Sequence, residues 1–157
     1  MSARIENVWD IDQYNELIKK DCPVVVKFFA DWCGACQVTT TQFGNISRNP
    51  DFSHITFASV NVDKNSEISD KEDVRSVPTF LLYNKGRKRG RIVGVEDPEK
   101  FEEYMTKKIK SKLPKKQILP ETETFWNKAK DLFDRTINRL WSFTEYTLGK
   151  IKGLFWR

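Results

Sequence analysis

Cysteine, histidine and long apolar runs are scarce in this sequence of 157 residues, and each shortage excludes a class of protein. Three cysteines are too few for the disulfide framework of a small secreted domain. The single histidine, His54, has no partner in the sequence and is expected to be structural. No apolar stretch approaches 18 residues, so we expect no membrane-spanning helix. The first residues lack the apolar core of a secretory signal, so we expect a cytoplasmic protein in a reducing compartment.

Charge is distributed unevenly along the chain, which has a net charge of +5. Residues 1–111 contain 17 basic and 17 acidic residues, whereas residues 112–157 contain ten basic and five acidic residues. Residues 110–116 form a basic stretch that Pro114 interrupts, and together with Pro120 this stretch is typical of a linker at the start of the second part. The sequence therefore predicts a globular domain over residues 1–111, a basic linker over residues 112–121 and a functionally separate tail over residues 122–157.

The stretch that carries chemistry is residues 24–36, in which the apolar run VVVKFFA is followed by DWCGAC. The run predicts a buried strand, and a helix is expected to begin at Cys33. The positive N-terminal end of that helix would favour the thiolate of Cys33. Cys36 lies one helical turn further along, from where it can attack a mixed disulfide at Cys33. Gly34 is expected to permit a tight turn and to leave room for a substrate chain.

A metal site is the alternative interpretation of these cysteines, with Cys22 and His54 completing a Cys₃His ligand set. An extended strand between Cys22 and Cys33 would hold them roughly 26 Å apart, at ~3.3 Å per residue. We therefore expect no metal, and the sequence implies no organic cofactor.

WCGAC after an apolar strand resembles the active site of the thioredoxin family. Asn61–Asp63 (NVD), Val77–Thr79 (VPT), Gly86 and Gly94 extend the resemblance, which covers about residues 4–110. It implies an α/β thioredoxin fold and a thiol–disulfide oxidoreductase that acts on protein disulfides. It also implies an electron donor such as a thioredoxin reductase. In that family the proline matching Pro78 follows a cis peptide bond and faces the cysteines, so Trp32, Val77 and Pro78 would form the substrate surface.

Four positions depart from the family pattern. Lys27 replaces the buried aspartate that serves as proton acceptor for the second cysteine, and Ser59 replaces its usual basic companion. A cation at Lys27 near the thiols would favour thiolate and raise the reduction potential, unless its side chain extends outward to solvent. Ala35 replaces the proline between the cysteines, and Thr41 replaces the proline that kinks the helix. Together these changes predict a specialised thioredoxin.

Hydrophobic spacing predicts the element order β-α-β-α-β-α-β-β-α over residues 4–110. Asp10 and Gln13 are expected to cap the first helix, and Pro98 is expected at the first position of the last helix. Phe101, Tyr104, Met105 and Ile109 are expected to form the buried face of that last helix. The expected strands cover residues 4–9, 24–30, 54–62, 77–84 and 89–95, and a turn covers residues 85–88.

The tail over residues 122–156 has the periodicity of one long amphipathic helix. Its apolar half is rich in aromatic and aliphatic residues, and we expect it to dock into a protein partner or assembly. The residues expected to engage that partner are Trp126, Phe133, Leu140, Trp141 and Ile151. Two alternatives remain: the helix packs on its own domain, or it lies on an anionic membrane surface.

Two functions from different classes follow from these observations. The intact WCGAC favours a thiol–disulfide oxidoreductase, with Cys33 as nucleophile and Cys36 as resolving thiol. The replaced aspartate and the added tail favour a thioredoxin-fold subunit of a larger assembly, by analogy with thioredoxin-like light chains of axonemal dynein. The basic hairpin over residues 85–91 is either a solvated turn or a contact for an acidic partner, lipid or nucleic acid; it lacks aromatic residues, so nucleic acid is not expected.

Overall fold

The computed structural model describes residues 5–116 and 130–133 of the chain, which divides into two units, residues 1–116 and 117–157. The first unit has the element order that the hydrophobic spacing predicts. Its elements are β1 (Glu6–Val8), α1 (Ile11–Lys19), β2 (Pro23–Phe29), α2 (Gly34–Arg48), the short 3₁₀ helix η1 (Pro50–Phe52), β3 (Thr56–Asn61), α3 (Ser66–Lys71), β4 (Thr79–Asn84), β5 (Arg87–Val93) and α4 (Phe101–Lys112).

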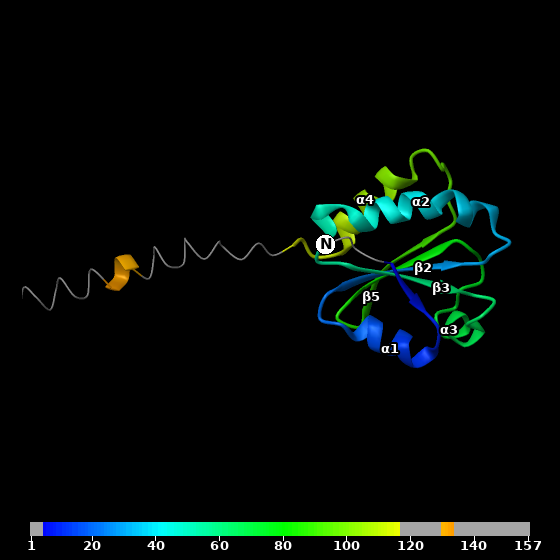
Figure 1. Cartoon of the computed structure of the whole chain (residues 1–157), viewed down its shortest axis with the longest axis horizontal. Coiled ribbons are helices and arrows are strands. Elements are labelled where there is room, and N and C mark those ends of the chain that lie inside the picture. The colour runs from blue at the N-terminus through cyan, green and yellow to red at the C-terminus, as the bar shows by residue number, and fades with distance from the viewer. Residues whose placement is uncertain (1–4, 117–129, 134–157) are drawn as a thin grey trace, which may run out of the picture. The chain divides into compact units, whose positions relative to one another are not determined.

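The five strands form one mixed sheet in the order β1-β3-β2-β4-β5. β1, β3 and β2 run parallel, whereas β4 runs antiparallel to β2, and β5 antiparallel to β4. Figure 1 shows α1 and α3 on one face of this sheet and α2 and α4 on the other. The expected α/β architecture, a mixed sheet flanked by helices, is therefore confirmed.

Both faces of β2 are buried, which explains its continuous apolar sequence. Val24, Val26 and Phe28 join the core under α1 and α3, whereas Val25 joins the core under α2 and α4. Side chains alternate between the two faces of a strand, so Lys27 lies on the same face as Val25. The central strand thus carries a lysine toward the α2 side of the interior.

The cap of the first helix is close to the prediction. Asp10 accepts a hydrogen bond at 2.8 Å from the backbone N–H of Gln13. The Gln13 side chain returns a bond of 3.0 Å, but it accepts from the N–H of Trp9 rather than from that of the capping residue. The reciprocal arrangement therefore fixes the backbone at Trp9 as well as the start of α1.

The start of the last helix differs from the prediction, because α4 begins at Phe101 and not at Pro98. The Asp97 carboxylate accepts hydrogen bonds from the backbone N–H groups of Glu99 and Lys100. It therefore stabilises a turn over residues 97–100 and does not cap the first turn of α4. The Lys100 side chain donates to the same carboxylate and, with these backbone bonds, lowers the pKa of Asp97.

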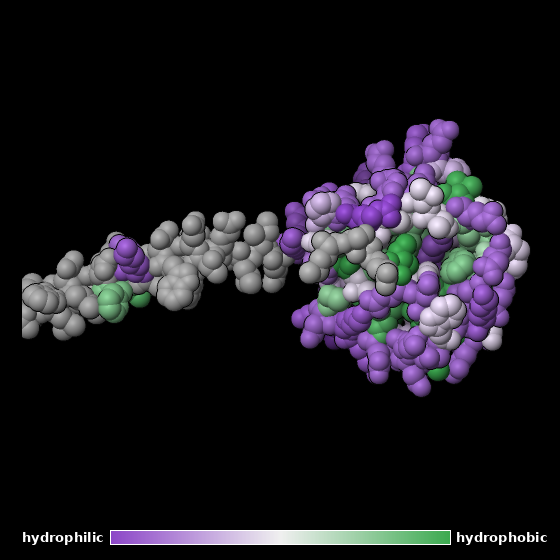
Figure 2. Space-filling view, viewed as in Figure 1, coloured by the Kyte–Doolittle hydropathy of each residue, from purple (hydrophilic) through white to green (hydrophobic). Residues whose placement is uncertain are grey.

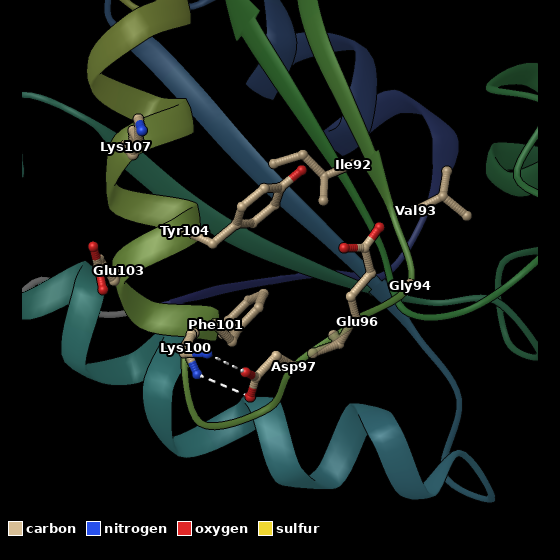
Figure 3. A pocket seen from close by; sticks show the side chains of 11 residues that line it. Ile92, Val93, Gly94, Glu96, Asp97, Lys100, Phe101, Glu103, Tyr104 and Lys107 are labelled. Carbon is tan, nitrogen blue, oxygen red and sulfur yellow. Dashed lines mark hydrogen bonds and ion pairs between the residues drawn. The ribbon is translucent and has the colours of Figure 1, made fainter.

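Tyr104 was expected in the core, and the structure shows it exposed instead. α4 buries Phe101, Met105 and Ile109, which follow one another at intervals of four residues, and Tyr104 lies beside this stripe. There it borders a hollow of about 410 Å³ between α4 and the end of β5, where it extends toward Ile92 (Figure 3).

The hairpin between β4 and β5 is tighter than expected. Its turn consists of Lys85 and Gly86, both with positive φ (51° and 73°), as two-residue hairpin loops require. The register shifts near Leu82 and Tyr83, where Arg89 is the extra residue of a β-bulge in β5. Residues 87 and 88, expected in the turn, are therefore already part of the strand.

Little of the tail lies within the described residues. Residues 130–133 are helical, and Phe133 is 64% exposed. The other expected docking residues, Trp126, Leu140, Trp141 and Ile151, lie outside the described residues, so the long helix stays a prediction. Within the described parts of the chain, no helix is long and apolar enough to cross a membrane. Figure 2 shows a mostly hydrophilic surface on the visible face of the first unit.

Candidate active site

The topology gathers several loops at one edge of the sheet. β1, β2 and β3 are parallel and end there, and β4, being antiparallel to β2, begins there. The loop after β2 carries Trp32 and Cys33, and the loop before β4 carries Val77 and Pro78. Segments more than 40 residues apart in the sequence therefore meet at the first turn of α2.

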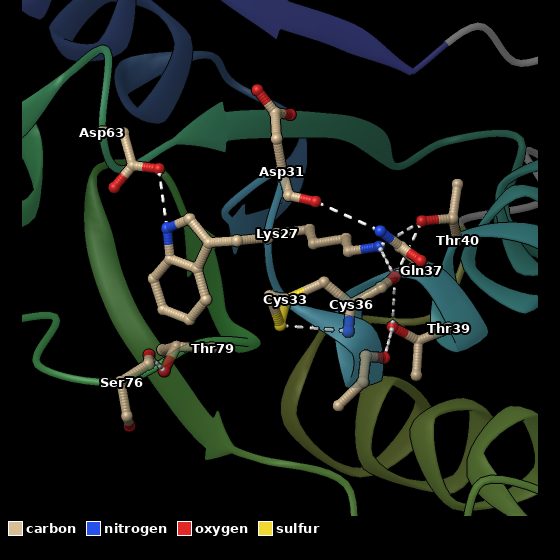
Figure 4. The surroundings of a disulfide bond; sticks show 12 residues. Lys27, Asp31, Cys33, Cys36, Gln37, Thr39, Thr40, Asp63, Ser76 and Thr79 are labelled. Carbon is tan, nitrogen blue, oxygen red and sulfur yellow. Dashed lines mark hydrogen bonds between the residues drawn. A yellow bond between two sulfur atoms is a disulfide. The ribbon is translucent and has the colours of Figure 1, made fainter.

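Cys33 and Cys36 are joined by a disulfide bond, with their Cα atoms 5.2 Å apart (Figure 4). Cys33 is the N-cap of α2, and its Sγ accepts a hydrogen bond of 3.1 Å from the backbone N–H of Cys36. This bond and the positive end of a 15-residue helix both stabilise negative charge on the Cys33 sulfur. The expectation that the helix begins at the first cysteine is thus confirmed to within one residue.

The two cysteines differ in exposure. Cys33 is 6% exposed and Cys36 is 1% exposed, and both pack with Ala30 in a small apolar cluster. Phe29, Val62 and Val77 pack against this cluster. Of the two sulfur-bearing residues, Cys33 is the one that an approaching molecule meets first.

Trp32 directly precedes the cysteine pair, and the loop before β4 reaches it through Val77, which packs against the cluster of the two cysteines. Trp32 is 73% exposed, and its indole N–H donates to Asp63 at 3.0 Å, which fixes the ring beside the disulfide. The Val77–Pro78 peptide bond is cis, as the family resemblance implies. The Pro78 carbonyl accepts from the N–H of Gly94 at 2.8 Å, so the end of β5 supports this loop.

Gly34 is not required by the backbone, contrary to the expectation of a tight turn. Its φ is not positive, and α2 simply begins at this residue. A Cβ atom placed on Gly34 would meet no atom within 4 Å. Open space therefore lies in front of the first turn of α2, which agrees with the room expected for a substrate chain.

Lys27 is buried beside the cysteine pair, with only 4% of its surface exposed. Its Nζ donates to the Cys36 carbonyl oxygen and to Thr40 Oγ1, each at 2.9 Å (Figure 4). The rings of Phe29 and Phe43 lie about 6 Å from the same nitrogen, at 6.0 and 5.9 Å. The alternative in which this side chain extends outward to solvent is wrong, because helices cover both faces of β2.

The Cys36 carbonyl oxygen accepts three side-chain hydrogen bonds, from Lys27, Thr39 and Thr40. Sequence reasoning missed the two threonines. Thr40 follows Cys36 by four residues, the spacing at which a threonine hydroxyl commonly bonds back to a helix carbonyl, and this signal could have revealed it. These bonds attach the lysine ammonium to the backbone of the second cysteine.

Burial lowers the pKa of Lys27 from 10.5 to about 8, because the surroundings provide neutral acceptors and no counterion. Among the described residues, no carboxylate forms an ion pair with Lys27. The folded protein therefore loses this proton at a lower pH than the unfolded chain does.

Lys27→Met should raise the free energy of unfolding at pH 7 and change its pH dependence. Between about pH 8 and pH 9.5 the unfolded wild-type chain holds more protons than the folded one, so wild-type stability should rise, by up to about 1.4 kcal/mol per pH unit. Lys27→Met should abolish that rise in urea titrations, and exposed Lys19→Met should retain it. Tyr14 and Tyr83, whose pKa is raised by burial, oppose this rise as the unfolded tyrosines begin to ionise toward pH 10, so the slope is read below about pH 9. A flat wild-type profile would contradict this account.

Cys22 and His54 lie elsewhere. The Cys22 sulfur is 3.3 Å from Thr56 Oγ1, at the opposite end of β2 from the disulfide. His54 Nε2 is 3.0 Å from the carbonyl oxygen of Pro114, beyond the end of α4. The structure does not bring either residue to the cysteine pair.

A second buried polar cluster, which sequence reasoning missed, lies on the α1 and α3 face. The hydroxyls of Tyr14 and Tyr83 are 2.9 Å apart, and burial raises the pKa of both. Burial alone would raise the pKa of Glu72, but Lys88 and the tyrosines outweigh it and lower that pKa. Lys88 forms an ion pair with Glu72 at 2.6 Å, and Arg91 donates to the carbonyls of residues 72 and 73. Two basic residues of the hairpin thus have structural roles.

The site combines a cysteine pair at a helix N-terminus, an exposed tryptophan before it and a cis proline in the loop whose Val77 packs against the cysteines, and this arrangement suits the exchange of thiols and disulfides. Comparisons with known proteins agree. A family model for thioredoxin matches residues 7–107, and this chain belongs to the thioredoxin family.

Relatives within the family resemble the first unit over most of their own length. Thioredoxin of Coprinus comatus is 31% identical over 105 residues, covering 67% of this chain and 98% of the relative. Thioredoxin-1 of Schizosaccharomyces pombe is 38% identical over 98 residues, covering 62% and 92%. The crystal structure of Malassezia sympodialis thioredoxin superposes with a TM-score of 0.60 at 31% identity, covering 67% and 90%. The expected thioredoxin fold is therefore confirmed.

Proposed function

We propose that this chain is a thiol–disulfide oxidoreductase in which Cys33 is the nucleophile and Cys36 the resolving thiol. The observation that carries the proposal is the Cys33–Cys36 disulfide at the N-terminus of α2, with the Cys33 sulfur accepting a backbone hydrogen bond. In the dithiol form, the Cys33 thiolate attacks one sulfur of a substrate disulfide, and the other substrate sulfur leaves as a thiolate. A mixed disulfide then joins Cys33 to the substrate.

In the resolution step, the mixed disulfide between Cys33 and the substrate is replaced by the Cys33–Cys36 disulfide. The Cys36 thiol loses its proton and attacks the Cys33 sulfur, which releases the second substrate thiolate and forms the Cys33–Cys36 disulfide. Two electrons have passed to the substrate, and an electron donor of the thioredoxin reductase class restores the dithiol. Trp32 precedes Cys33 in the chain, and Val77 packs against the cysteine cluster and is followed by Pro78. We assign the substrate surface to these three residues, and the Val77 backbone would offer hydrogen bonds to an extended substrate.

Insulin reduction tests the proposal directly. The wild-type chain, supplied with dithiothreitol as electron donor, should accelerate the precipitation of the insulin B chain well above the rate with dithiothreitol alone. A rate equal to that background would overturn the assignment and would favour the second candidate, a thioredoxin-fold subunit of a larger assembly. We propose the cytosol as its compartment, because a reductase of this kind works in a reducing environment.

In our proposal, the tail binds a protein partner and so places the oxidoreductase at that partner. The tail sequence places ten apolar residues on one half of a helix, nine of them large, and burying each large one is worth roughly 1.5–3 kcal/mol. Apolar surface of that extent marks an interaction site, and we propose a protein partner rather than a membrane because Asp131, Asp134 and Glu145 fall on the polar half. Among the proposed contacts, the structure describes Phe133, and its ring is exposed.

Truncation after Lys116 should leave a folded domain that still reduces insulin but no longer co-purifies with the partner. This end point preserves Leu113, which is buried in the core, and Pro114, whose carbonyl oxygen contacts His54. Thermal unfolding, insulin turnover and affinity purification of both forms measure the three properties. Retained co-purification would contradict docking through the tail, and a lower melting temperature would show that the tail packs on its own domain. Salt-sensitive flotation of the full chain with anionic liposomes would indicate a membrane.

A further inference from the structure

Trp9 lies at the same edge of the sheet as the disulfide. It directly follows β1, just as Trp32 and Cys33 follow β2, and Asp63 and Lys64 follow β3. Because these three strands are parallel and adjacent, their carboxyl ends form one continuous rim. Molecules that bind to sheets of this kind bind outside the carboxyl ends of the strands.

A hollow of about 160 Å³ occupies this rim between the ends of β1 and β2. Trp9 and Lys64 border it, and so does Asp31, which is two residues before Cys33. Its other lining residues are mainly small and polar: Asn7, Val8, Phe29, Ser59, Asn61 and Asn65. The hollow therefore borders the loop that carries the nucleophile. Its lining polar groups are ordered by hydrogen bonds to one another, with Ser59 Oγ donating to Asn7 Oδ1 and Asn65 Nδ2 donating to the Asn61 carbonyl oxygen.

Trp9 is held in place although its side chain is exposed. Its backbone N–H donates to Gln13 Oε1, and the next residue, Asp10, caps α1. The side chain is nevertheless 64% exposed, so the hydrophobic core gains little from it. A second hollow, of about 490 Å³ between β1 and α1, also borders Trp9. Tryptophan is enriched among the residues that carry most of the binding energy at protein interfaces, so an exposed Trp9 between two hollows is a candidate contact.

Charge adds a second feature to the same rim. Lys64 Nζ lies 3.8 Å from the Asp31 carboxylate, so opposite charges stand together between the hollow and the cysteine loop. Both side chains are largely exposed and are available to a polar chain that crosses the rim. An exposed indole and a pair of exposed opposite charges together suit a polypeptide, with its alternating peptide groups and side chains, better than a small disulfide molecule.

We propose that Trp9 and this hollow form a subsite for the polypeptide segment that flanks the disulfide of a protein substrate. The inference rests on the proposed oxidoreductase function and deepens it, because it names the part of the substrate that is recognised. In this arrangement a substrate side chain or peptide group stacks on the Trp9 indole and enters the hollow while its cysteine reaches Cys33. Small disulfides, which have no flanking chain, bypass the subsite.

Trp9→Ala should lower kcat/KM for insulin about five- to tenfold, chiefly through KM, as expected when a well-placed interface tryptophan is removed. Reduction of the small disulfide 5,5′-dithiobis(2-nitrobenzoate) should stay within about twofold of wild type, because that molecule has no chain to occupy the hollow. Trp9→Phe should recover most of the insulin rate. Tyr104→Ala, an exposed aromatic residue on α4, is the matched control and should leave both rates unchanged.

Two results would overturn the subsite: an unchanged insulin rate in Trp9→Ala, or an equal loss for insulin and the small disulfide. Binding of iodoacetamide-alkylated insulin B chain, which cannot exchange disulfides, separates this inference from the proposed function. Weaker binding by Trp9→Ala together with no reduction by wild type would retain the subsite and reject the oxidoreductase. Equal binding by both forms would reject the subsite whatever the activity.

Discussion

Cys33→Ser is expected to abolish reduction of insulin, leaving only the background rate of the electron donor. The substitution removes the thiolate that α2 stabilises, and Cys36, at 1% exposure, is covered from an approaching disulfide. Cys36→Ser should behave differently, because attack by Cys33 survives and resolution does not. This variant should accumulate mixed disulfides with substrate proteins, visible as bands that disappear on reduction in gel electrophoresis.

Cys22→Ser is the matched control for these variants. Cys22 is only partly buried and lies at the far end of β2, so its loss should leave turnover unchanged. Full activity in Cys33→Ser would end the oxidoreductase proposal. Trapped complexes that form in Cys33→Ser through Cys36 would instead reverse the roles of the two cysteines.

Lys27→Asp should lower the reduction potential by about 30 mV or more, since 30 mV corresponds to about 1.4 kcal/mol for a two-electron couple. The wild-type ammonium lies 2.9 Å from the Cys36 carbonyl oxygen in a buried site, where it favours thiolate and hence the reduced form. We therefore expect a wild-type potential above the value of about −270 mV typical of thioredoxin. Equilibration with glutathione buffers, followed by alkylation of free thiols, measures both potentials.

Lys27→Met removes the positive charge without adding a negative one, so it isolates the effect of the ammonium. It also provides a test if Lys27→Asp folds poorly. It should lower the potential by a smaller amount than Lys27→Asp. The difference between wild type and Lys27→Met should be largest near pH 6–7 and should shrink above about pH 8, where Lys27 loses its proton. Identical potentials in all three forms would mean that the ammonium has no effect on the sulfur atoms.

The element order and the location of the cysteine pair could be predicted because their signals are local. An apolar run followed by WCGAC specifies a buried strand, a turn and a helix within 25 residues. The start of α4 was predicted wrongly because Asp97 and Pro98 fit both a helix start and the turn that precedes it. Only the tertiary position of Phe101, which anchors the helix in the core, decides between these two structures.

The placement of Lys27 could have been predicted from the fold but not from its neighbours in sequence. Residue alternation assigns it to the face of Val25, and a central strand covered by helices on both faces offers no route to solvent. The proposed subsite at Trp9 could not be predicted from the sequence, for a different reason. Trp9, Asp31 and Lys64 come from three separate loops, and only the parallel pairing of β1, β3 and β2 brings them together.

The two edges of the sheet bear on how copies of this protein behave at high concentration. An unpaired edge strand is a template for edge-to-edge association between molecules. Here one edge, β1, has only three residues, and the other, β5, carries a bulge and the exposed cations Arg87 and Arg89. Two β5 edges that approach each other bring like charges together, which opposes self-association at ordinary salt. Because the Debye length falls to about 3 Å at 1 M salt, this protection against aggregation weakens as ionic strength rises.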